Sequence, residues 1–234
     1  MTSLPGMPGR AGAPRPDVGN LLRRALVLVV GLFLVALGIA LITRADLGTS
    51  AISAPPYVLS LWGSWTFGQY TFAMLVVLVA FQMVLLRRRY QPIQVLQLAA
   101  GLVFSAFIDL AMWITPLLTP DIYVMQLVQL ALGIVVLGIG VACQVVPRLT
   151  YLPGDGTVVA LVLATGVRFS RMKILFDSLL VAIAIALSFV FWGELRGVRE
   201  GTVAAAVLVG AVVGWVMPGV KRLAGRVGAL PPAG

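Results

Sequence analysis

The sequence predicts an all-α polytopic membrane protein with about six transmembrane helices and two short re-entrant half-helices, built as two inverted-topology repeats. Hydrophobic residues make up 60% of the 234 residues and charged residues only 11%, against about a quarter charged in soluble domains. Several apolar runs reach about 20 residues, which is enough to cross a hydrocarbon core of about 30 Å. The order long, short, long, long occurs twice along the chain.

The first repeat is expected over residues 21–115, after a flexible tail at residues 1–20 that is rich in Pro, Gly and Arg. Its spans are predicted at Leu21–Thr43, Thr66–Leu86 and Ile93–Ile114. A polar segment broken by Gly and Pro, Arg44–Pro56, interrupts them. The apolar piece that follows, Pro56–Gly63, is too short to cross a bilayer and is typical of a half-helix.

The second repeat is expected over residues 122–220 and is followed by a tail at residues 221–234, so that both repeats form a single membrane domain. Its spans are predicted at Ile122–Val146, Ile174–Trp192 and Thr202–Pro218. The polar break Pro147–Thr157 leads into a second short apolar piece, Thr157–Val167. The two halves therefore share one pattern, although their sequence identity is low.

The distribution of the basic residues along the chain supports this topology. If both short pieces return to the side on which they began, all but three of the 17 basic residues lie on one side of the membrane. The three exceptions are Arg44, Arg196 and Arg199. The positive-inside rule makes the basic side cytoplasmic, with both termini there, in the cytoplasmic membrane of a bacterium. Three crossings per half make the halves antiparallel, as in transporters with inverted repeats.

Composition also excludes several functions. The chain has no histidine, which excludes His-based zinc sites and Ser-His triads, and Cys143 has no second cysteine for an intrachain disulfide. The net charge of +9 comes from residues that flank apolar spans, so we expect a lipid bilayer and no nucleic acid as partner. We expect no enzyme activity, no cofactor and no metal.

Both breaks carry helix-start signals. Ser53 precedes Pro55-Pro56 and is expected to cap the first half-helix, and Asp155 or Thr157 is expected to cap the second. The N-terminus of a half-helix carries partial positive charge and free N–H groups that can hold an anion. Whether these ends bind a ligand or are only capped stays open.

Polar residues inside the spans are further candidates for a substrate or ion pathway. Asp109 lies in the third span, and Lys173 and Asp177 share one face of the fifth. The last two form either a charge-compensated site or an ion pair at the membrane interface. Gln126 and Gln129, three residues apart in the fourth span, are expected to line a cavity.

Four residues at the predicted outer ends of spans are candidates for gating or capping. Arg44 and Asp46 flank the first break and either gate the outer mouth or pair with each other. Glu200 and Thr202 open the last span, where a carboxylate stabilises the helix dipole.

Five motifs resemble the YczE/YyaS/YitT-type bacterial integral membrane proteins. They are Leu47–Ser60, the LQ…FID pattern of Gln97–Asp109, Leu152–Gly156, the spacing Phe169-x3-Lys173-x3-Asp177, and Gly197–Thr202. The resemblance marks Asp109, Asp155, Lys173, Asp177, Glu200, Gly201 and Thr202 as motif positions without assigning a ligand. Pro55 departs from the single-proline form of the family, and Asp155 stands where Glu is also expected. The resemblance implies a small polytopic membrane protein of unassigned transport or regulatory role, in some members linked to secondary-metabolite production.

Three functions are compatible with these features. The first is a gradient-driven permease or exporter for an unknown small molecule, with its site between the repeats. The second is a channel-like pore, and the third is a non-transporting protein that assists or regulates a partner. A homodimer or another protein partner stays open.

Overall fold

The computed structural model describes residues 18–87 and 96–230, and within these ranges it contains helices and no strand. The long helices are α1 (Val18–Arg44), α3 (Phe67–Leu86), α4 (Leu96–Ile114), α5 (Tyr123–Val145), α7 (Phe169–Trp192) and α8 (Glu200–Arg226). The shorter ones are the 3-10 helix η1 (Ala51–Ser53), α2 (Ala54–Trp62) and α6 (Pro153–Thr165). The predicted order of long and short helices is confirmed.

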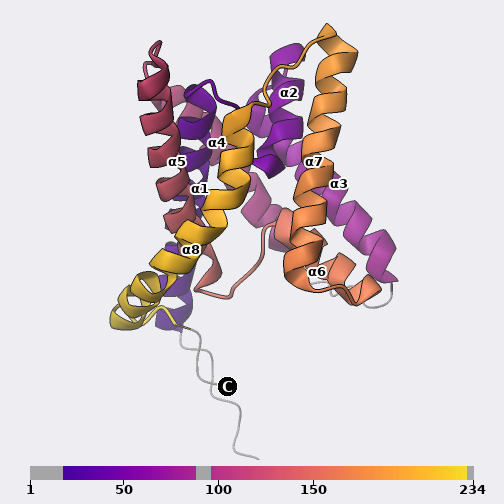
Figure 1. Cartoon of the computed structure of the whole chain (residues 1–234). Helices are drawn as coiled ribbons and strands as arrows, with labels where there is room; N and C mark the ends of the chain where they lie inside the picture. The colour runs from indigo at the N-terminus through magenta and orange to yellow at the C-terminus, as the bar shows by residue number, and fades with distance from the viewer. Residues whose placement is uncertain (1–17, 88–95, 231–234) are drawn as a thin grey trace, which may run out of the picture.

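The six long helices are long and apolar enough to cross a membrane, which makes the chain a multi-pass helical membrane protein. Figure 1 shows them crossing the body of the molecule, with α2 near one end and α6 near the other. Neither α2, with 9 residues, nor α6, with 13, has the length of a full crossing. The predicted membrane class and the six spans are therefore confirmed.

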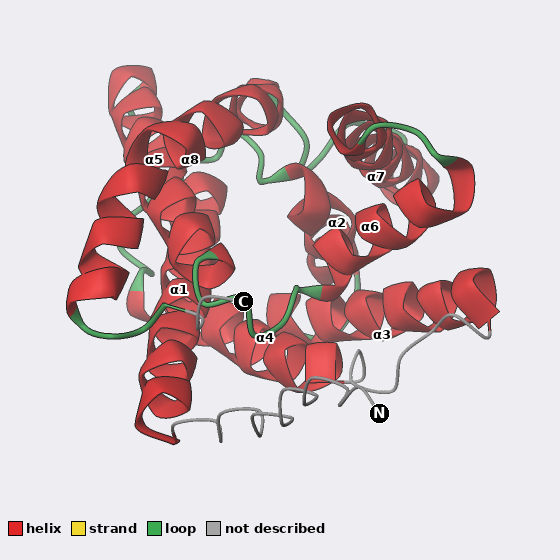
Figure 2. Ribbon diagram, turned by 90° about the horizontal axis from the view of Figure 1, so that it is seen from below, coloured by secondary structure: helices red, strands yellow, loops and turns green. Residues whose placement is uncertain are grey.

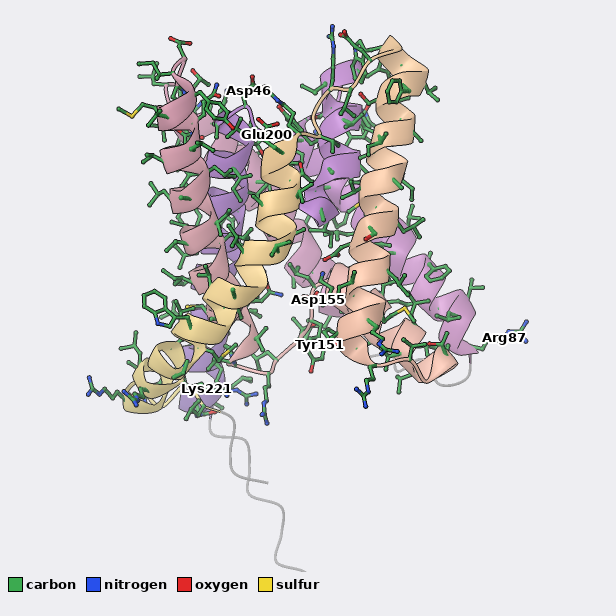
Figure 3. All side chains as sticks on the ribbon, in the orientation of Figure 1. Asp46, Arg87, Tyr151, Asp155, Glu200 and Lys221 are labelled. Carbon is green, nitrogen blue, oxygen red and sulfur yellow. The ribbon has the colours of Figure 1, made fainter. Side chains whose placement is uncertain are left out.

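The two ends of the helix bundle differ in charge. Figure 3 shows Arg87 and Lys221 at the lower end, which we call the basic end, and Asp46 and Glu200 at the upper end. The basic end also collects the described basic side chains at the start of α1, the end of α5 and the start of α7. Among described residues, only Arg44, Arg196 and Arg199 of the basic residues belong to segments at the upper end.

The core is built around α1 and α5, which make the most extensive helix pair in the structure. Glycines allow this close approach. A Cβ atom on Gly31 of α1 would lie 2.7 Å from the backbone nitrogen of Gln144, and one on Gly140 of α5 would reach the backbone of Val35. Small residues at such positions let helices in lipid gain van der Waals contact along their backbones.

The helix pairs around this core correspond between the two halves of the chain. The helix α1 packs on α4 as α5 packs on α8, α2 packs on α3 as α6 packs on α7, and α2 packs on α7 as α6 packs on α3. The main exception is that α3 packs along α4, whereas α7 has no comparable packing along α8. In the view from below, α1, α5 and α8 group on one side and α2, α6 and α7 on the other (Figure 2).

Two ends of the long helices differ most from their predictions: α7 begins at Phe169 instead of Ile174, and α8 ends later than expected. The last span was expected to end at Pro218, but α8 continues through this proline to Arg226 and includes the first residues of the expected tail. Proline removes one backbone hydrogen bond, and membrane helices tolerate that loss because local adjustment re-satisfies the freed groups. Most of the predicted N-terminal tail, residues 1–17, lies outside the described residues.

Candidate functional site

The first break docks onto the N-terminus of α8. After α1 the chain turns through Asp46 (φ 56°) and Gly48 (φ 105°), a conformation that glycine adopts without strain. The backbone N–H of Thr49 then donates to Oγ1 of Thr202 over 3.1 Å, and that of Gly201 donates to the Leu47 carbonyl over 2.7 Å. Thr202 therefore acts as an acceptor for a distant buried backbone group, a role beyond its predicted place at the helix start.

Ser53 occupies the N-cap position of α2, as predicted, but its side chain makes no capping hydrogen bond. Its hydroxyl accepts a bond of 2.8 Å from Oγ of Ser50 and is buried. The reason is local geometry: η1 runs directly into α2, so Ser53 has helical φ and ψ angles instead of the extended ones of a capping serine.

The second break corrects the capping prediction for α6. This helix begins at Pro153, with Leu152 at the N-cap and no side-chain cap, so Asp155 and Thr157 lie inside its first turns. Proline starts a helix well because its φ is fixed and it has no N–H to satisfy. The Thr157 hydroxyl donates to the Pro153 carbonyl over 2.7 Å and accepts from Nε2 of Gln82 over 3.1 Å.

The two breaks meet each other. Ile52 of η1 lies against Gly154 of α6, so closely that a Cβ atom on Gly154 would overlap the Ile52 Cδ1 atom. On either side of this contact the polar side chains of Thr49 and Thr157 are fully buried. We call this region the junction and define it as residues 48–53 and 153–157.

A charged triad adjoins the junction. Nζ of Lys173 lies 3.3 Å from Oδ1 of Asp155 and 3.1 Å from Oδ1 of Asp177, so the lysine joins α6 to α7. The three side chains are 32%, 34% and 21% exposed in that order, and with all three ionised the triad carries one net negative charge. Figure 3 shows Asp155 in the lower half of the molecule, closer to the basic end. Helix spacing indicated the pairing of Lys173 with Asp177, but it did not indicate that Asp155 joins them.

Asp109 lies apart from this triad and holds the start of α3. It accepts a 2.6 Å bond from Oγ1 of Thr66 and a 2.7 Å bond from the backbone N–H of Gly68. Thr66 is the N-cap of α3 and forms a capping box with Gln69. These bonds explain the carboxylate as a link between α3 and α4.

A cavity of about 400 Å³ opens at the upper end, and Arg44, Asp46, Tyr57 and Gln126 are among its lining residues. Arg44 donates to the Met112 carbonyl over 2.9 Å, but Asp46 pairs with Arg199 over 3.2 Å. Arg44 and Asp46 therefore do not pair with each other in the structure. Glu200 is an exposed neighbour, 3.7 Å from the Arg199 guanidinium.

The two candidate glutamines of α5, Gln126 and Gln129, have different roles. Gln126 lines the upper cavity and donates to the Pro120 carbonyl over 3.1 Å. Gln129 instead donates to the carbonyls of Leu41 and Leu118, over 3.0 Å and 2.7 Å, and so ties α5 to α1. Spacing alone placed both side chains on one helix face but did not distinguish a cavity wall from a helix tie.

Gln82, Thr49 and Arg199 were not among the predicted site residues. Gln82 donates to both Pro153 and Thr157, and Thr49 and Arg199 tie the first break to the start of α8. Their signal in the sequence was only a polar side chain within or beside an apolar span, which many residues share. Within the described ranges, no three His, Cys, Asp or Glu side chains gather as metal ligands would.

A comparison with protein families matches residues 22–218 to DUF6198, a family of unknown function. The chain belongs to this family. The match covers both breaks and all the predicted spans except the first residue, Leu21. It names no YczE/YyaS/YitT type, so that resemblance stays a prediction. Searches of curated proteins and of solved structures found no match. This member of DUF6198 is thus an integral membrane protein.

Proposed function

We propose that this DUF6198 protein is a gradient-driven permease or exporter for a small molecule, with its binding site at the junction of two inverted repeats. The basic end faces the cytoplasm of a bacterial cell, as the positive-inside rule requires, and both termini lie on that side. In this orientation α2 and α6 are half-helices that enter the membrane from opposite faces.

The correspondence of helix pairs supports the repeats. Each contact that α1, α2 or α3 makes with a neighbour has a counterpart made by α5, α6 or α7, apart from the α3–α4 contact. Each half contributes three crossings, so corresponding helices of the two halves cross the membrane in opposite directions. A pseudo-two-fold axis in the membrane plane accounts for both facts, and transporters are commonly built this way.

The contact of Ile52 with Gly154 carries the proposal. It joins the 3-10 helix η1 to the first turn of α6, next to the two breaks and beside an embedded lysine that holds two carboxylates. Irregular backbone at membrane depth is tolerated where it is buried in protein or lines a cavity, and ionisable groups there mark substrate or ion pathways. Asp155, Lys173 and Asp177 are the residues assigned to that pathway.

The unequal packing of the halves fits one state of a transporter. Gly101 of α4 receives the side chain of Leu75 from α3, whose Cδ1 lies 3.0 Å from where a Cβ would stand. In the proposed repeats Gly210 of α8 corresponds to Gly101. A Cβ atom on Gly210 would have no neighbouring atom within 4 Å. In the second state, α7 closes on α8 while α3 leaves α4, and access changes from one side of the membrane to the other.

The test compares cells that make the wild-type protein with cells that make Lys173→Ala or Lys221→Ala. Lys221 is the matched control because it is the other lysine of the chain and lies exposed at the end of α8. Mass spectrometry of cell extracts and medium should reveal a solute whose internal to external ratio changes with wild type and Lys221→Ala but not with Lys173→Ala. That solute should then cross the membrane of proteoliposomes in a saturable way.

Two results would contradict this proposal. If no solute ratio differs from that of cells with an empty vector, and the protein co-purifies with a stoichiometric partner, the regulatory function is favoured. If a solute crosses without saturation and without dependence on a gradient of a second ion, the channel is favoured.

A further inference from the structure

A second cavity, separate from the charged triad, lies at the basic end. Its volume is about 230 Å³, and it lies between the end of α3, the start of α4, the end of α5 and α6. Gln97 and Arg148 contribute polar groups to its wall, and Leu86, Leu149 and Leu163 contribute apolar ones. Thr150 and Tyr151 add two hydroxyl groups, and a mainly apolar wall with a few polar groups is the lining that an amphiphile requires.

Gln97 leaves a buried acceptor without a donor. The residue is 4% exposed, and its Oε1 atom has no hydrogen-bond partner. Gln97 and Gly156 both line the cavity, and a Cβ atom on Gly156 would be 2.7 Å from Oε1, so close packing holds the buried amide beside the cavity. An unpaired buried acceptor is costly, and a ligand with an O–H or N–H group would remove that cost.

Arg148 supplies a positive charge at the mouth of the same cavity. It is exposed and has no ion-pair partner within the described part of the chain. Its backbone turn, with a φ of 49°, is held by Arg24 of α1, which donates to the Pro147 carbonyl over 2.8 and 3.0 Å. A guanidinium in a positioned turn suits a phosphate, which it can bind through two parallel hydrogen bonds.

We propose that this cavity binds a phospholipid of the basic-side leaflet whose headgroup carries a hydrogen-bond donor. The phosphate binds Arg148, a hydroxyl or ammonium group donates to Oε1 of Gln97, and an acyl chain lies along Leu86 and Leu163. The location fits, because the cavity is formed where α3 and α5 end, at the level where helices meet headgroups. This lipid site does not depend on the transport function.

The experiment measures lipid binding to the full-length protein in detergent by native mass spectrometry. Phosphatidylethanolamine and phosphatidylglycerol have headgroup donors, whereas phosphatidylcholine has a phosphate but no donor. We expect the first two to bind wild type on the order of fivefold more tightly than phosphatidylcholine, the worth of one hydrogen bond. Gln97→Leu should remove this preference, and Arg148→Ala should weaken all three lipids. Arg222→Ala, another exposed arginine near the basic end, should change neither.

The wild-type comparison decides the proposal even if Gln97→Leu does not fold. Equal binding of phosphatidylcholine and the two donor lipids would overturn it, because water would then satisfy Gln97. No measurable binding of any of the three would overturn it as well. A fourth measurement uses glycerol 3-phosphate. If it binds as tightly as the lipids do, the proposal of a lipid ligand is overturned and a soluble phosphate compound is the ligand.

Discussion

Ile52 and Gly154 are in direct contact, and this contact joins the two broken segments of the chain at one place. A side chain at position 154 has no room while Ile52 keeps its conformation. The contact is also where α6 enters its first turn, so its packing affects the position of Asp155.

Gly154→Leu should lower the stability of the protein, because its side chain would displace Ile52 from a packed position. Overpacking costs about 1–3 kcal/mol, although part of this is recovered because leucine favours a helix more than glycine does. In an Ile52→Ala background the same substitution should cost less, since the space is then free. Thermal unfolding in detergent measures both effects, and equal losses in the two backgrounds would show that the contact does not matter.

Thr202→Val should destabilise the docking of the first break on α8. Valine has nearly the same shape but no acceptor, so the buried N–H of Thr49 loses its partner at a cost of about 1–3 kcal/mol. Thr202→Ser keeps the hydroxyl and should stay within about 1 kcal/mol of wild type. Hydrogen exchange of the Thr49 amide, expected to accelerate in Thr202→Val only, tests the assignment independently of global stability.

Asp109→Ala should weaken the start of α3 without stopping transport. It removes the acceptor of two hydrogen bonds, and bonds to a charged group contribute about 1.5–3 kcal/mol each before the exposure of this site is taken into account. Asp109→Asn retains an acceptor and should lose less stability. If Asp109→Asn folds normally but abolishes transport of the solute identified for wild type, Asp109 belongs to the pathway after all.

Lys173 and Asp155 should show a small coupling energy in a double-mutant cycle. Both side chains are about one-third exposed, so solvent screening limits the coupling to about 0.5–1 kcal/mol. The cycle uses Lys173→Met, Asp155→Asn and the double variant, measured by thermal unfolding. Transport should be lost in Lys173→Met despite this small effect on stability, and full transport activity would remove the triad from the mechanism.

Gly101→Leu and Gly210→Leu should act differently, although the proposed repeats assign the two glycines to matching places. At Gly101 the new side chain meets Leu75, so folding stability should fall by about 1–3 kcal/mol. At Gly210 the space is open, so stability should be unchanged, but closure of α7 on α8 should be blocked and transport lost. Normal transport by Gly210→Leu would argue against this closure.

Much of the fold could be predicted because the bilayer constrains the sequence directly. A crossing helix needs about 20 apolar residues, so the ends of α3, α4 and α5 fall within a few residues of their predicted places. Prolines and glycines predicted both breaks. The same local rules failed at Pro218 and at Asp155, since a helix in lipid continues through a proline and Pro153 already starts α6.

The candidate site was predictable in part. Lys173 and Asp177 are neighbours by helix geometry alone, since residues four apart share a face. Asp155 joins them across 18 positions of the chain, and Asp46 pairs with Arg199 across 153. Such partners depend on how helices pack, which hydropathy does not encode.

Hydropathy, charge asymmetry and helix-start signals specified the membrane class, the order of the helices and the basic side, because each depends on residues close together in the chain. Tertiary packing decided the rest: that Ile52 meets Gly154, that Asp109 holds α3 and that Gln97 lacks a donor. It also decided that α3 packs on α4 while α7 stays apart from α8. These outcomes depend on contacts between distant segments, where the shapes of facing side chains and the satisfaction of buried polar groups select one arrangement.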